Sequence, residues 1–200
     1  MQTQTKTRTL VQMAVLTAMS VLLVYLIHLP IIPAAPFLEY DPADVPILIG
    51  TFMLGPIGGL IITALACIVQ GVTVSAASGI IGILMHFFAT AAYAGVAGII
   101  YKRNHTRKGA GIALAVGALA MVATMVIWNL IFTPIFMGAD QAAVIAMMPF
   151  IVLFNVIKAV TNGIITFILY KPLSKVLRMT GGKTKSDVYV RFFSRTVVKI

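Results

Sequence analysis

Long apolar runs constrain this chain more than any other feature of its sequence. The run from residue 109 to residue 137 contains no charged residue. Other apolar runs cover residues 9–29, 45–54, 56–72, 78–101 and 144–177. A helix needs about 20 mostly apolar residues to cross a bilayer. Because 60% of the residues are apolar and only 10% are charged, the chain cannot coat a soluble fold with polar side chains. We therefore expect an all-α integral membrane protein.

The placement of basic residues predicts how many times the chain crosses. Short basic loops remain in the cytoplasm, and Lys/Arg residues cluster near Lys6, in the stretch 102–108 and after residue 170. All three clusters share one side only if the short run 45–54 crosses separately and "GPIGG" forms a turn. The sequence thus predicts a six-helix bundle, residues 1–178, with both termini cytoplasmic and a basic cytoplasmic tail, residues 179–200. The expected location is a bacterial cell membrane, crossed several times.

Several functions are disfavoured by the sequence. The net charge of +10 is explained by basic loops that orient the bundle and contact anionic membrane lipids, so no nucleic acid partner is expected. The stretch "MTGGKTKS" lacks the first glycine of a phosphate-binding loop, since Leu177 stands in its place. The three histidines have no metal-ligand spacing, and no catalytic constellation is recognisable. We expect neither a metal site nor catalytic residues.

Lys158 is the only basic residue deep within a predicted span. An uncompensated lysine near the bilayer centre costs about 2.5–3.5 kcal/mol, so it needs a partner, a cavity or a ligand. Asn155 and Asn162 lie three and four residues away, on the same helical face. One interpretation is an ion pair with a loop carboxylate such as Asp41. The interpretation that we favour is a ligand-binding face, with Asn129 contributing a second buried amide.

Two further features support a binding role. Three of the five acidic residues lie in "LEYDPADVP", residues 38–46, and this loop would close the outer mouth of the predicted pocket. Trp128, beside Asn129, would offer a ring for stacking on a planar ligand. In the first run, Ala14 and Ala18 form a small-xxx-small pattern that lets another helix approach closely.

These motifs together resemble a known family. The stretches "YDPADVPILIG", "GPIGG", "AGIIYKRNHTRKG" and "FNVIKAVTNGIITFILYKPL" are similar to the substrate-binding S components of energy-coupling factor (ECF) vitamin transporters, most of all the riboflavin-specific members. The resemblance spans residues 8 to about 178. It implies a pocket that is open to the outside and binds one vitamin molecule. It also implies partners: a transmembrane T component and two cytoplasmic ATPase subunits, which alone use ATP.

The resemblance also implies roles for individual residues. Asp41, Asn129, Asn155 and Lys158 match positions around the riboflavin ring and ribityl chain, and Tyr40 is expected in the same substrate-binding set. Ala14 and Ala18 match the face that contacts the T component. We therefore predict a riboflavin-binding S component that is not an enzyme and carries no cofactor.

Three alternatives remain open. In the first, the chain would be an S component for a different vitamin or precursor. In the second it would be a solitary facilitator, and in the third an intramembrane enzyme that uses His86 or Asp41.

Overall fold

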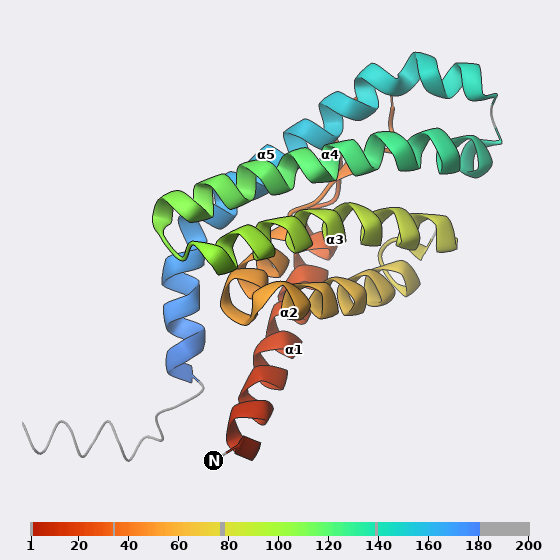
Figure 1. Cartoon of the computed structure of the whole chain (residues 1–200). Helices are drawn as coiled ribbons and strands as arrows, with labels where there is room; N and C mark the ends of the chain where they lie inside the picture. The colour runs from red at the N-terminus through yellow and green to blue at the C-terminus, as the bar shows by residue number, and fades with distance from the viewer. Residues whose placement is uncertain (1, 34, 77–78, 139, 181–200) are drawn as a thin grey trace, which may run out of the picture.

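The computed structural model describes residues 2–33, 35–76, 79–138 and 140–180. Five long helices and one short hairpin make up this part of the chain (Figure 1). The helices are α1 (Gln2–Leu26), α2 (Asp44–Val72), α3 (Gly79–Arg103), α4 (Arg107–Met137) and α5 (Gln141–Thr180). All five are long and apolar enough to cross a membrane. The expected tail lies outside the described residues, apart from its first two positions.

Helix α2 contains both of the runs that were expected to form separate helices. Its backbone leaves the helical conformation only at Gly55, where φ is 85° and ψ is 175°. Glycine is the residue that adopts this conformation readily. Pro56 then restarts the helix, because its fixed φ suits a first helical position. The two expected helices are therefore present as two helical segments of one bent element, and they join at a single non-helical residue instead of a longer "GPIGG" turn.

The helices pack largely in the order of the sequence. Helix α2 lies against α1, α3 and α5, α3 lies against α4, and α4 lies against α5. In Figure 1, α3 and α4 run side by side, and α5 follows α4 before it changes direction in its blue part, which contains Pro172. A Cβ atom at Gly98 would lie 2.6 Å from Thr51 Cγ2 and 2.9 Å from the backbone of Pro56. Helix α3 thus packs directly against the bend in α2 because residue 98 has no side chain.

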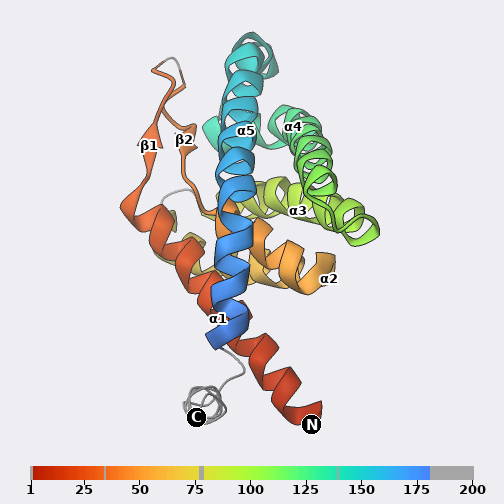
Figure 2. The ribbon, with the colours of Figure 1, turned by 90° about the vertical axis from the view of Figure 1, so that its left-hand side faces the viewer.

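The segment between α1 and α2 forms a hairpin beside α5 (Figure 2). Strand β1 (Leu29–Pro30) pairs antiparallel with β2 (Glu39–Tyr40). The loop between the strands carries apolar side chains that pack on the first half of α5. This small cluster contains Ile32, Ala35, Leu38, Val144, Ile151 and Phe154. It holds the acidic stretch against the helix that carries Lys158.

Candidate functional site

Two of the three acidic residues in the stretch before and at the start of α2 are buried. Asp41 is 5% exposed, and Asp44 is 0% exposed. Asp44 accepts hydrogen bonds from Thr90 Oγ1 at 2.7 Å and from Asn162 Nδ2 at 3.0 Å. Since a buried carboxylate without partners is strongly disfavoured, these donors from α3 and α5 fix the beginning of α2.

Asp41 forms an ion pair with Lys158. The lysine Nζ donates to Asp41 Oδ2 at 2.7 Å, and the other carboxylate oxygen accepts from the backbone N–H of Ala43 at 3.0 Å. Burial by itself would raise the pKa of Asp41, but the Lys158 ammonium outweighs this effect and holds that pKa below its usual value. The lysine therefore favours the ionised form of this carboxylate.

Asn162 connects the same loop to α5 a second time. Its Nδ2 donates to the backbone carbonyl of Asp41 at 3.1 Å as well as to Asp44, and its Oδ1 accepts from Tyr40 at 2.9 Å. On the other side, Ser20 of α1 donates to the carbonyl of Ala43 at 2.7 Å. Loop positions 40, 41 and 43 are thus attached by hydrogen bonds to α5 and α1.

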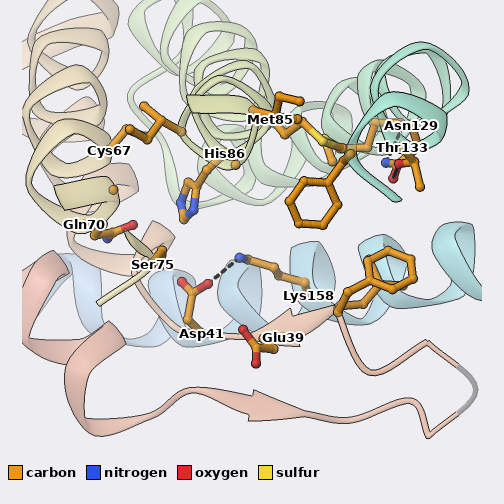
Figure 3. Close-up of a pocket in the computed structure, with 18 of the residues that line it drawn as sticks. Glu39, Asp41, Cys67, Gln70, Ser75, Met85, His86, Asn129, Thr133 and Lys158 are labelled. Atoms are coloured by element: carbon orange, nitrogen blue, oxygen red, sulfur yellow. Dashed lines mark hydrogen bonds and ion pairs between the residues drawn. The ribbon is translucent and has the colours of Figure 1, made fainter. Parts of the chain in front are cut away.

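A cavity of about 170 Å³ lies between this loop and helices α2, α3, α4 and α5 (Figure 3). Lys158 and Asp41 form one wall, with His86 facing them from α3 and Gln70 from α2. Asn129 lies on the wall formed by α4. The remaining surface is largely apolar and includes Phe37, Leu38, Met85, Met125, Phe136 and Phe154. A cavity in which polar and charged side chains converge beside apolar ones has the character of a small-molecule site.

Two of the polar side chains at the cavity have nitrogen atoms without a partner. Gln70 is 2% exposed, and its Nε2 makes no hydrogen bond with the described residues. The same holds for Nε2 of His86. A buried amide left unpaired costs roughly 1–3 kcal/mol. Both nitrogens are therefore unpaired in this arrangement, whereas Asn129 donates to Met125 O at 2.8 Å and accepts from Thr133 at 2.8 Å.

The structure brings together three of the five residues expected to bind substrate. Asp41, Asn129 and Lys158 line the cavity, whereas Tyr40 and Asn155 are not among its lining residues. Asn155 is 2% exposed and donates to Ile151 O within its own helix at 2.8 Å. The two interpretations of Lys158 prove compatible, because the ammonium pairs with Asp41 and also faces the cavity.

Trp128 does not occupy the position that was expected from the sequence. Its ring stacks between Phe88, with centroids 4.1 Å apart, and Phe132, at 4.7 Å, and it is absent from the residues that line the cavity. Sequence reasoning missed Gln70, although a signal existed: it is the only amide side chain between residues 45 and 72. Its position on the inner face of α2 depended on the bend at Gly55.

The predicted partner-contact residues lie on the outer surface. Ala14 and Ala18 are both exposed, on the opposite side of α1 from the buried Leu16 and Ser20. An exposed pair of alanines one turn apart leaves a shallow strip where a second helix can approach closely.

Comparisons with known proteins agree on one family. A sequence model described as "ECF transporter, substrate-specific component" matches residues 8–170. The chain is 28% identical over 184 residues to the riboflavin transporter RibU of Streptococcus thermophilus, with 86% of each chain covered. It is 25% identical over 179 residues to the riboflavin transporter FmnP of Bacillus subtilis, covering 84% of this chain and 94% of that protein. Among solved structures, the S component of a bacterial ECF transporter has a TM-score of 0.75 and 25% identity, covering 86% of this chain and 98% of that one.

Proposed function

Because this chain belongs to the substrate-specific components of ECF transporters, we propose that it captures riboflavin outside the cell and releases it inside with the help of partner subunits. Like its relatives, it is a membrane transport protein and not an enzyme. Riboflavin is its substrate and not a cofactor. The partners are a transmembrane T component and two cytoplasmic ATPases, which supply the energy from ATP.

The observation that carries this proposal is the ammonium of Lys158 at the wall of the cavity. An ammonium has three N–H donors, and one of them donates to Asp41. The remaining donors, together with the free nitrogens of Gln70 and His86, suit a ligand that is rich in acceptors. A flavin ring offers carbonyl and ring-nitrogen acceptors and a flat apolar face that matches the rest of the wall.

The size of the cavity implies that binding involves movement. Typical ligand pockets measure roughly 300–1,000 Å³, and this cavity measures about 170 Å³. We infer that the hairpin segment, residues 27–43, moves away from α5 to admit the vitamin and then returns. This segment contributes His28, Glu39 and Asp41 to the wall, and His28 Nε2 lies 2.8 Å from Glu39 Oε2 at its more exposed edge.

We infer further that the chain crosses a bacterial cell membrane six times, with both termini in the cytoplasm. The bend at Gly55 supports this topology, because it lets α2 approach one side of the bilayer and return. In Figure 1 the N-terminal end of α1, the basic turn between α3 and α4 and the blue end of α5 all lie to the left, whereas the connection between α4 and α5 lies to the right. This arrangement gathers the basic ends on one side.

The direct test is to identify what the protein binds. Protein purified from cells grown with riboflavin should carry a yellow ligand with the mass of riboflavin. Lys158→Ala should then weaken riboflavin binding at least tenfold, about 1.4 kcal/mol, in a fluorescence-quenching titration. Lys171→Ala, an exposed lysine of the same helix, is the control and should bind normally. An unchanged dissociation constant for Lys158→Ala would remove Lys158 from the site, and copurification of a different vitamin would replace riboflavin as the substrate.

A further inference from the structure

A second hollow lies between α4 and α5, on a different part of the molecule from the cavity described above. It has a volume of about 320 Å³ and an almost entirely apolar lining. Small residues of the two helices form most of its floor, namely Gly111, Ala115, Ala118, Ala159 and Gly163. Phe167 closes one end. None of the residues that line this apolar groove lines the first cavity.

The end of the groove at Phe167 is basic. The guanidinium of Arg107 lies 5.2 Å from the centre of the Phe167 ring. Arg107 precedes Gly111 by one helical turn, and Lys171 follows Phe167 by one turn, so both cations continue the two helix faces that form the groove. Both side chains are exposed, and no carboxylate pairs with either of them in the described part of the chain.

We propose that this groove binds one molecule of an anionic phospholipid. One acyl chain lies along the small residues of α4 and α5, and the phosphate lies against Arg107 and Lys171. The occupant of the groove must be apolar, because the groove lies within two membrane-spanning helices. The occupant of its end is expected to be negative, because the Arg107 guanidinium lies at this end and Lys171 follows Phe167 by one helical turn. A lipid with an anionic headgroup meets both requirements in one molecule.

The dimensions also favour an acyl chain. The floor extends from Gly111 to Ala118 on α4, which is about 10 Å of helix rise. A partner helix would instead need an exposed strip along most of a span. With the orientation proposed above, the basic end faces the cytoplasmic leaflet, where anionic lipids attract juxtamembrane lysine and arginine residues.

Native mass spectrometry of the detergent-purified full chain would test this proposal. Phosphatidylglycerol and phosphatidylcholine with identical acyl chains would be added in equal amounts. We expect one phosphatidylglycerol to be retained in preference to phosphatidylcholine. Each cation contributes about 1 kcal/mol at a membrane surface, so Arg107→Ala and Lys171→Ala should each lower this retention about fivefold. Equal retention of the two lipids by the unaltered protein would overturn the proposal.

Two further variants distinguish lipid binding in this groove from a general attraction of anionic lipids to basic residues elsewhere on the protein. Lys6→Ala with Lys102→Ala removes two cations elsewhere and should leave lipid retention unchanged. Ala115→Phe fills the groove and should release the lipid while riboflavin binding persists. If Ala115→Phe does not fold, as judged by thermal unfolding, the smaller Ala118→Leu takes its place. Normal lipid retention in a folded groove-filling variant, or an equal loss in the Lys6/Lys102 control, would show that the groove does not hold the lipid.

Discussion

At the scale of single residues, the pair formed by Asp41 and Lys158 combines two roles that sequence reasoning had treated as alternatives. The lysine is 7% exposed and the aspartate 5%. Two charges at this depth are tolerated because each neutralises the other and because Ala43 satisfies the second carboxylate oxygen. The same pair fixes the loop to α5 and presents an ammonium to the cavity. The sequence predicted the importance of Lys158 and named Asp41 as a candidate partner, and the structure confirms that pair.

The first prediction concerns the stability of this pair. Asp41→Asn leaves the buried ammonium without its counter-ion and should lower the free energy of unfolding by about 3–5 kcal/mol. Lys158→Met should also destabilise the protein, and the double variant should be more stable than the sum of the two losses implies. Thermal unfolding of the ligand-free protein in detergent measures all three. Glu39→Gln is the control, because its pair with His28 is more exposed and should be worth less than about 1 kcal/mol. Additive losses would mean that the two charges do not interact in solution.

The second prediction concerns the free amide of Gln70. Gln70→Leu removes a buried nitrogen that has no partner, so the ligand-free protein should become slightly more stable. Riboflavin binding should weaken about three- to tenfold, because a neutral hydrogen bond contributes roughly 0.5–1.5 kcal/mol. Titration and thermal unfolding of the same samples check both effects.

Thr166→Val provides the matched control for Gln70→Leu. Thr166 is 0% exposed, and its hydroxyl also lacks a partner among the described residues, but it does not line the cavity. Its replacement should raise stability and leave riboflavin binding unchanged. Normal binding by Gln70→Leu would exclude Gln70 from contact with the vitamin.

At the scale of elements, the apolar runs predicted most helix positions, because an apolar segment in a membrane can satisfy its backbone only as a helix. The expected runs 78–101 and 109–137 correspond to α3 and α4 within a few residues. The hairpin was not predicted, because each strand has only two residues. The join between the runs 45–54 and 56–72 was expected as a turn of "GPIGG", and in the structure it uses Gly55 alone. The conformation of a single glycine determines it, and apolar periodicity carries no information about that conformation.

The third prediction concerns this glycine. Gly55→Ala places a Cβ atom in open space, so no clash is expected, but φ of 85° is unfavourable for alanine. The substitution should destabilise the protein by about 1–3 kcal/mol. Gly95→Ala in α3 is the control, because its Cβ would meet only Leu60 at 4.0 Å in a regular helix. This control should be neutral or stabilising by up to about 1 kcal/mol. Equal thermal stability of the two variants would contradict the strained bend.

At the scale of the whole molecule, the family assignment gives separate interpretations to the interior cavity and to the outer surface of α1. Under the proposed function, the interior cavity would hold the substrate, and the exposed Ala14 and Ala18 of α1 would contact a partner. The composition and the charge distribution predicted the membrane class, and the motifs predicted the family. They could not predict that Tyr40 and Asn155 lie away from the cavity wall. Side-chain direction on a buried helix depends on packing against its neighbours, and sequence spacing alone does not specify that packing.

The fourth prediction concerns the partner-contact face. Ala14→Leu and Ala18→Leu enlarge exposed side chains without touching the core. They should reduce copurification with the T component and slow riboflavin uptake, while binding by the isolated protein remains normal. Ala142→Leu, an exposed alanine of α5, is the control and should affect neither. Full assembly of the two α1 variants would exclude this face as the contact. Uptake in cells that lack the T component and the ATPases would instead favour a solitary facilitator.

The anchorage of the hairpin segment has a kinetic consequence. Its hydrogen bonds to Ser20, Lys158 and Asn162 are buried. Breaking one of them leaves a buried polar group without a partner, which is unfavourable while the other bonds remain. If the segment opens as proposed, half-open arrangements should therefore be scarce, and the segment should have two main positions. Release of a bound molecule would then require these hydrogen bonds to break together. We therefore expect slow dissociation of the ligand from the isolated protein.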